Sequence, residues 1–195
     1  MKRLLVGFII GLVALSSGSA LAGDKLVIDA GASTVDWLGK KITGQHRGKV
    51  GIKGGHVVFE GAALKSATIE IDLTTLTCVD IESPKWNAKL VNHLKSDDFF
   101  SVEKYPIATF VLKKSSAKKE GTYRLEGDLR MKGKTHPISF ELKVARVGPK
   151  IKATGKVVLD RTTWGIKYNS GKFFPSIGDK LIYDDFELTL SLVTK

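Results

Sequence analysis

The chain has 195 residues, of which 43% are hydrophobic, and it carries one cysteine and a formal net charge of +11 at pH 7. The length suits one domain with a sizeable core, and the single cysteine excludes an intramolecular disulfide framework. The basic charge favours anionic partners. Because the basic residues are scattered along the chain, we interpret most of them as a solvated outer face.

The first 22 residues have the pattern of a secretory signal peptide. Two basic residues precede the apolar stretch Leu4–Leu15, and Ala20 and Ala22 supply the small side chains that a signal peptidase requires. The apolar stretch is shorter than the roughly 20 residues of a membrane-spanning helix, which makes an uncleaved anchor the weaker alternative. We predict cleavage after residue 22, export from the cytoplasm and one mature domain of residues 23–195. Export argues against nucleic acid as a partner.

Alternation of apolar and polar residues dominates the mature chain. It is clearest in residues 69–73, 123–131, 138–144 and 186–192. A period of two is typical of antiparallel strands with one apolar and one wet face. We count about eight or nine such strands, and a closed barrel accommodates them without exposed sheet edges. The sequence therefore predicts an all-β fold, an antiparallel barrel of about eight strands.

Glycine-rich and charged segments separate the predicted strands. Gly54-Gly55 predicts a tight hairpin between two short strands. Residues 118–121, 132–137 and 146–150 are further turn candidates.

One segment breaks the alternation, between residues 84 and 95. It begins with a proline directly after Ser83, as helices often do. Its larger apolar side chains recur at helical spacing: Trp86, Leu90, Val91 and Leu94. We predict a short amphipathic helix across a mouth or a side of the barrel.

No catalytic or metal-binding motif stands out. The histidines lack the close spacing of a zinc pair, and there is no nucleophile elbow or phosphate-binding loop. We interpret Asp97-Asp98 as loop solvation or helix capping rather than a glycosidase pair. We interpret Cys78 as a small buried residue at a strand end, with an intermolecular bridge or a reactive thiol as alternatives. We therefore predict no metal, no cofactor, no catalytic residues and no enzyme activity.

Three segments carry a family resemblance. Residues 93–110, "HLKSDDFFSVEKYPIATF", resemble the signature of the YceI-like family, the bacterial polyisoprenoid-binding proteins. Residues 123–142 resemble that family's Gly-Asp-Leu strand and Gly-x-Thr-x-Pro turn, and residues 159–169 its Asp-Arg-x-x-Phe-Gly-Ile segment, with tryptophan in place of the phenylalanine. The resemblance implies a lipocalin-like barrel in the periplasm. It also implies an isoprenoid-type or similar long-chain amphipathic lipid, held inside for transport, storage or sequestration.

On this hypothesis, large apolar side chains form the wall of the site, with about half of them lining a cavity and the rest packing as core. The candidates are Trp37, Phe59, Phe99, Phe100, Phe110, Phe140, Leu142, Trp164 and Leu188. Lys40, Lys41 and Lys172 are candidates for binding a phosphate or pyrophosphate head group, with a solvated surface as the alternative. The "KFFP" segment, residues 172–175, reads as a lid or a loop plug.

Two other functions stay open at this point. One is a stress-response or membrane-interaction module with a solid core and a basic outer face. The other is an enzyme acting on an apolar substrate, with Tyr105, Asp160 or Arg161 as the ionisable group inside the barrel. The sequence also leaves open peripheral membrane contact and a homodimer.

Overall fold

A computed structural model describes residues 23–195, so the predicted signal peptide lies outside the described residues. The strands are β1 (Asp24–Val27), β2 (Thr34–Lys41), β3 (Gly44–Glu60), β4 (Ala63–Cys78), β5 (Ile107–Ala117), β6 (Thr122–Met131), β7 (Lys134–Val147), β8 (Lys150–Asp160) and β9 (Ile182–Val193). The helical segments are α1 (Pro84–Lys95) and the 3₁₀ turns η1 (Lys119–Gly121), η2 (Arg161–Trp164) and η3 (Gly178–Lys180). Within residues 23–195, no helix combines the length and the hydrophobicity needed to cross a membrane.

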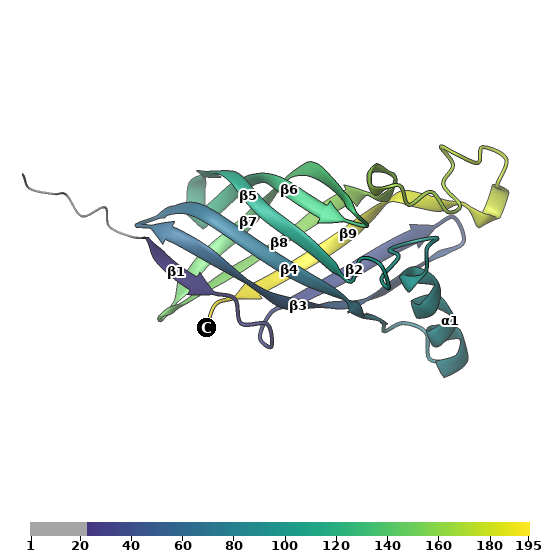
Figure 1. The fold of residues 1–195 in the computed structure, drawn as a ribbon, viewed down its shortest axis with the longest axis horizontal. Coiled ribbons are helices and arrows are strands. Elements are labelled where there is room, and N and C mark those ends of the chain that lie inside the picture. Colours follow the sequence, from purple (N-terminus) through teal and green to yellow (C-terminus); the bar gives the residue numbers. More distant parts are fainter. Residues whose placement is uncertain (1–22) are drawn as a thin grey trace, which may run out of the picture.

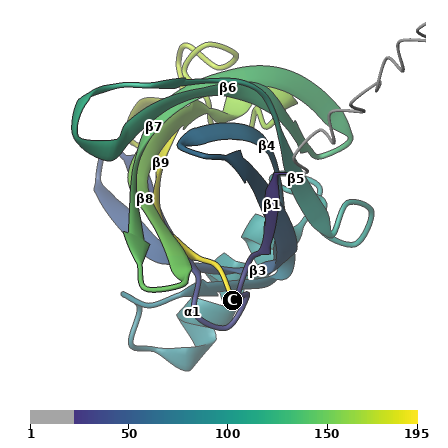
Figure 2. The ribbon, with the colours of Figure 1, turned by 90° about the vertical axis from the view of Figure 1, so that its left-hand side faces the viewer.

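Strands β2 to β9 form a closed antiparallel barrel (Figures 1 and 2). Each strand of this ring pairs with the next in sequence, and β9 returns to pair with β2. Every strand of the ring therefore has a neighbour on both sides, which limits the edge open to another chain, although β7 and β8 pair only over residues 143–147 and 150–154. The predicted eight-stranded antiparallel barrel is confirmed.

Strand β1 fills a gap in the wall that β2 is too short to cover. One edge of the 17-residue β3 pairs with β2 over residues 44–50 and with β1 over residues 56–59. Ile28 then bridges Thr194 at the end of β9. Together β1 and β2 occupy the place of one long strand between β3 and β9.

The predicted hairpin at Gly54-Gly55 is wrong. Strand β3 continues through both glycines and stays paired with β4, with a shift of register between Ile52 and Gly54. Gly55 has a φ of +150°, and a Cβ at this position would lie 2.3 Å from the Thr68 carbonyl oxygen. Lys53 is therefore the extra residue of a bulge, and the two glycines follow it inside one long strand, a role that uses the same residue type as a turn.

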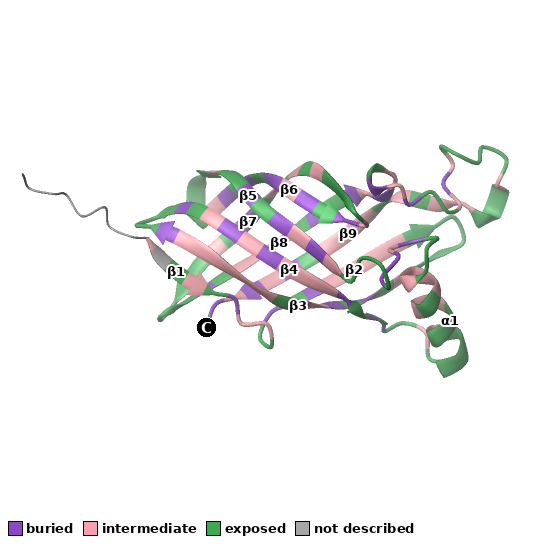
Figure 3. Cartoon of the chain, in the orientation of Figure 1, coloured by how far each residue is buried: buried purple, intermediate pink, exposed green. Residues whose placement is uncertain are grey.

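The alternating segments form strands, and buried and exposed positions alternate along them (Figure 3). In β6, Tyr123 and Leu125 are buried while Arg124 and Glu126 are exposed. Helix α1 spans the predicted range, with Pro84 in its first turn.

Helix α1 and residues 165–181 stand at one end of the barrel, and β1 and the C-terminus lie at the other (Figure 1). We call the first end the mouth. Helix α1 contacts the 165–181 segment through the rings of His93 and Tyr168, whose centroids lie 4.6 Å apart. The side chain of Asn87 ties α1 to the end of β4 by donating to the carbonyls of Cys78 (2.9 Å) and Ile81 (3.0 Å).

Candidate ligand-binding site

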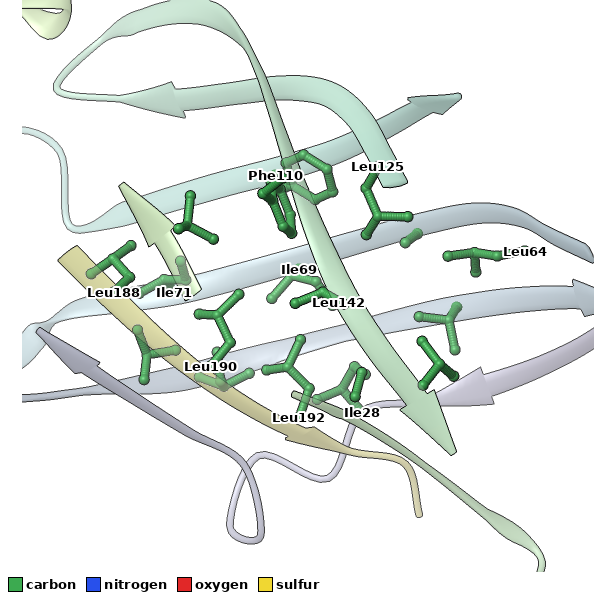
Figure 4. Close-up of a pocket in the computed structure, with 18 of the residues that line it drawn as sticks. Ile28, Leu64, Ile69, Ile71, Phe110, Leu125, Leu142, Leu188, Leu190 and Leu192 are labelled. Carbon is green, nitrogen blue, oxygen red and sulfur yellow. The ribbon is translucent and has the colours of Figure 1, made fainter. Parts of the chain in front are cut away.

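Two adjoining cavities occupy the interior of the barrel. The inner cavity lies away from the mouth, and inward side chains from around the ring surround it (Figure 4). All of its lining residues are apolar except Thr194, whose hydroxyl accepts a hydrogen bond from the Ile151 amide (2.9 Å). This chamber offers a ligand a hydrocarbon-like surface and almost no hydrogen-bonding groups.

The outer cavity lies at the mouth and has a mixed lining. Apolar residues of α1, such as Leu90 and Leu94, contribute to its wall. Its charged or polar lining residues are Lys40, Lys41, His46, Arg161, Tyr183 and Asp185. The two cavities meet along a shared ring of apolar residues: Val35, Ile71, Leu129, Leu159 and Leu188.

The barrel is not packed solid. The inner and outer cavities have volumes of about 100 and 160 Å³, whereas one water needs roughly 10–15 Å³. The burial of the wall agrees with this, because the inward-facing Phe140 and Leu188 are only partly buried although they point away from bulk solvent. A solid core would cover such side chains completely.

Eight of the nine predicted wall residues line these cavities. Phe59, Phe110, Phe140 and Leu142 line the inner cavity; Trp37, Phe99 and Phe100 line the outer cavity; Leu188 lines both. More of them face open space than the expected half, because the alternation of the strands turns most large apolar residues inward. Their role in binding stays a prediction.

Trp164 is the one wall candidate that lines neither cavity, and it packs as core. It is 2% exposed in η2, where its Nε1 donates to the Leu129 carbonyl at 3.1 Å. Its ring stands edge-on to that of His136, with centroids 5.6 Å apart. A buried tryptophan whose N–H has a hydrogen-bond partner contributes to packing. Trp164 therefore packs η2 against the barrel wall at Leu129 and His136.

Trp37 is held over a glycine of the neighbouring strand. It pairs with Gly48 of β3, and a Cβ on Gly48 would lie 2.6 Å from the Trp37 ring. The Trp37 Nε1 donates to the Thr77 carbonyl at 3.0 Å. The indole is therefore fixed in place at the outer cavity.

Phe99 and Phe100 enter the outer cavity from a compact turn after α1. The Ser96 carbonyl accepts hydrogen bonds from the amides of Phe99 (3.1 Å) and Ser101 (2.9 Å). Phe100 packs against Phe186 of β9, with ring centroids 6.4 Å apart. Asp97 and Asp98 of the same turn point to separate partners, as expected for solvated loop residues.

The head-group candidates differ in their surroundings. Lys40 and Lys41, at the end of β2, both contribute to the lining of the outer cavity. The neighbouring strand β9 has two extra residues opposite them, between the partners of Gly39 and Lys41. The Lys40 ammonium pairs with Glu187 at 2.5 Å. Within residues 23–195 Lys41 has no ion pair, which makes it the more available cation.

Lys172 does not line either cavity. Its ammonium lies 2.6 Å from Asp160 and 3.7 Å from Asp184. Burial alone would raise the pKa of Asp160, but the hydrogen bonds from Lys172 and Thr162 outweigh burial and lower it. Lys172 is thus engaged in an ion pair at the loop rather than directed at the interior.

Arg161 is the organising residue of the mouth. It is buried, and its guanidinium donates to four carbonyls: Ile166 (3.0 Å), Tyr168 (2.8 Å), Ile182 (2.9 Å) and Tyr183 (3.1 Å). Burial lowers the pKa of Arg161, and the charge of Asp184 partly opposes this effect. Sequence reasoning considered Arg161 only as a reactive group, because carbonyl partners leave no signal in a sequence.

Comparison with known protein families identifies the family of this chain. The model of the YceI-like domain matches residues 26–194, nearly all of the described chain. The chain belongs to the YceI-like family. It is 31% identical over 150 residues to a UPF0312 protein of Pseudomonas putida strain GB-1, covering 72% of each chain. It is 30% identical over 157 residues to the protein YceI of Escherichia coli O157:H7, covering 76% of this chain and 75% of the relative.

Solved structures share the YceI-like fold at lower identity. Burkholderia cenocepacia BcnA superposes with a TM-score of 0.67 at 21% identity, covering 86% of this chain and 99% of BcnA. A polyisoprenoid binding domain from Saccharophagus degradans gives a TM-score of 0.66 at 14% identity, covering 87% of this chain and 97% of that domain.

Proposed function

We propose that this YceI-like protein binds a long-chain amphipathic lipid, of isoprenoid or similar type, along the axis of its barrel. The observation that carries the proposal is the polarity of the interior, which is apolar in the inner cavity and mixed at the mouth. Each CH₂ group transferred from water into such an apolar site contributes about 0.8 kcal/mol. The polyisoprenoid binding domain from Saccharophagus degradans, which has the same fold, supports an isoprenoid as the first ligand to test.

The contacts of the three ionisable residues that an enzyme hypothesis would use are consistent with binding without catalysis. Tyr105 is partly exposed and packs against Gly133, outside both cavities. Asp160 accepts from Thr162 and Lys172, and the donors of Arg161 are directed at backbone carbonyls. These contacts support binding without turnover. We propose that the protein carries, stores or sequesters its lipid after export to the periplasm.

The mouth also has the features of a membrane-contacting surface. Trp86 is 55% exposed and Phe174 50% exposed, on α1 and on the 165–181 segment. The ammonium groups of Lys85 and Lys89 lie 5.9 and 5.0 Å from the Trp86 ring. Aromatic rings flanked by lysines suit the interface of an anionic bilayer. We propose that the mouth docks there while lipid enters or leaves.

Native mass spectrometry tests the lipid proposal. The protein is purified from its own host and then titrated with a polyprenyl phosphate, the corresponding neutral polyprenol and a ubiquinone. We expect a 1:1 adduct with at least one of them, and weaker binding of an analogue with the same head and a much shorter tail. Apo protein alone after purification, with no uptake in the titration, would contradict the proposal.

Vesicle sedimentation tests membrane docking. We expect more binding to phosphatidylglycerol vesicles than to phosphatidylcholine vesicles, and a loss of binding in the Trp86→Ser and Phe174→Ser variants. The matched control is Val147→Ser, which removes an exposed apolar residue from the end of β7 that lies away from the mouth. Equal losses in all three variants would show that the mouth has no special role.

A further inference from the structure

Three side chains with metal-binding atoms converge at the end of the β3–β4 pair, near the mouth. The ligand atoms of His46, Cys78 and Asp80 all lie within 4.8 Å of one another. The separation of 32 residues between His46 and Cys78 in the chain hides this cluster from any search for closely spaced ligands. We propose that these three residues bind a zinc ion.

Strand pairing produces the cluster. Gly48 pairs with Cys78, and the Val79 amide donates to the Arg47 carbonyl at 3.0 Å, which continues the ladder beyond the last paired residues. The same antiparallel progression sets His46 opposite Asp80. Cys78 and Asp80, two residues apart, share one side of the chain as alternation requires.

The two carboxylate oxygens of Asp80 each contact one of the other ligands, at a distance near the ligand spacing of a tetrahedral site, and all three ligands lie within 4.8 Å of one another. His46 Nδ1 lies 3.2 Å from Asp80 Oδ2, and Cys78 Sγ lies 3.0 Å from Asp80 Oδ1. Zinc bonds of roughly 2.0–2.3 Å place neighbouring ligand atoms about 3.3–3.7 Å apart around the ion. Small side-chain rotations would therefore open the space that the ion needs.

The surroundings hold the three ligands in position. The Arg47 amide donates to Asp80 Oδ1 at 3.2 Å. Asn87 fixes the chain on both sides of Asp80 through the carbonyls of Cys78 and Ile81. Outer contacts of this kind orient metal ligands and stabilise the bound ion.

The donor set selects the type of metal. An imidazole nitrogen, a thiolate sulfur and a carboxylate oxygen together suit Zn²⁺, a borderline-soft ion that accepts all three. The Cys78 thiol would release its proton to the solvent on coordination. His46 and Asp80 keep side-chain exposures of 36% and 22%, so an ion can enter from solvent, while Cys78 is buried. Three protein ligands leave a fourth position for water.

The proposal does not depend on lipid binding, although His46 also lines the outer cavity. A second histidine–aspartate pair offers an internal comparison. His93 Nε2 lies 3.0 Å from Asp98 Oδ2, but neither residue belongs to a cluster of three potential ligands among residues 23–195. If any histidine beside a carboxylate sufficed, both pairs would bind zinc equally well.

The test uses tag-free protein stripped with a chelator and titrated with Zn²⁺ against a chromophoric competitor. We expect one tight site per chain, with affinity falling at least about 10-fold in Cys78→Ser and in His46→Gln. The matched control His93→Gln should bind as the wild type does. Because Cys78 is the only cysteine, Zn²⁺ should also slow its reaction with a thiol reagent, and Co²⁺ should give a thiolate charge-transfer band.

Two results would overturn the proposal. One is a wild-type protein without a stoichiometric site and without zinc protection of the thiol. The other is an equal loss of affinity in His46→Gln and His93→Gln. Circular dichroism of each variant shows whether it is folded, and thiol protection in the wild type keeps the test valid if Cys78→Ser does not fold.

Discussion

The inner cavity and the mouth are built by opposite means. The inner cavity comes from regular strands whose alternate residues point inward, and its lining is apolar apart from Thr194. The mouth comes from irregular backbone: a register shift at Gly39–Lys41, the η2 turn, and positive φ at Ser101 and Asn169. The regular strands supply a nearly uniform apolar surface, whereas the mouth combines Lys40, Lys41 and Arg161 with apolar residues in one lining. For the proposed lipid ligand, we therefore expect the barrel interior to hold the tail and the mouth to select the head.

The largest expected effect is the difference between lysine substitutions on the inner and the outer face of β8. Val157 of β8 lines the inner cavity, while its neighbour Val158 is 60% exposed on the outside. Val157→Lys should abolish lipid uptake and cost on the order of 4 kcal/mol in unfolding free energy, because the buried ammonium loses its hydration. The matched Val158→Lys should change neither quantity by much. Native mass spectrometry and urea unfolding measure both, and equal behaviour of the two variants would refute the apolar chamber.

A smaller effect should come from filling the inner cavity. Ala153 lines it from β8, and Ala153→Leu should lower affinity for a polyprenyl lipid about 10-fold by taking the place of one or two CH₂ groups. The unfolding free energy of the apo protein should stay level or rise. In a solid core the same change would overpack the site and cost about 1–3 kcal/mol. Ala145→Leu, at an exposed position of β7, is the control.

At the mouth, the charge of Lys41 should affect the affinity only for lipids with a charged head group. Lys41→Glu should weaken binding of a polyprenyl phosphate by about 5-fold, roughly 1 kcal/mol, and leave the neutral polyprenol unaffected. Lys40→Glu should act less cleanly, because it also breaks the pair with Glu187. Lys152→Glu, on the outer face of β8, controls for net charge. If Lys41→Glu weakened the binding of the polyprenyl phosphate and of the polyprenol equally, the head group would not lie near Lys41.

The smallest expected effect concerns acid stability at the mouth. The pKa of Asp160 is lowered in the folded protein, chiefly by the hydrogen bonds from Lys172 and Thr162 that outweigh burial. The stabilisation is therefore present above the unfolded-state pKa of about 3.9 and is lost as the pH falls through the lower folded value. Between pH 6 and pH 3, Asp160→Asn should lose less unfolding free energy than the wild type, and an identical loss would rule out this pair as a contributor. Urea titrations at the two pH values provide the measurement.

Much of the barrel could be predicted because alternation is a local property of the chain. Residues 123–131 and 186–192 carry the pattern without interruption, and they form β6 and most of β9. The helix was equally visible, since its apolar spacing and its starting proline both lie within residues 84–95. The glycine pair in β3 led to a wrong prediction of a hairpin, because a bulge and a hairpin turn both require the backbone freedom of glycine.

The site could be predicted only in part. Aromatic residues on alternating strands were expected to face inward, but Trp164 lies on a 3₁₀ turn, where that rule does not apply. The carbonyl partners of Arg161 and the approach of His46 to Cys78 depend on tertiary pairing between distant segments. A lysine's partner is equally invisible in sequence, so Lys41 and Lys172 seemed equivalent although only Lys172 is paired with acidic residues.

The most direct test of lipid binding along the barrel axis is the position of a bound lipid in a crystal structure. A polyprenyl phosphate analogue brominated near the end of its tail would give an anomalous signal at that end. Binding along the barrel axis predicts bromine in the inner cavity, between Phe110 and Leu142, with the phosphate at the mouth near Lys41. Bromine at the mouth or on the outer surface, with the inner cavity filled by rearranged side chains, would contradict it.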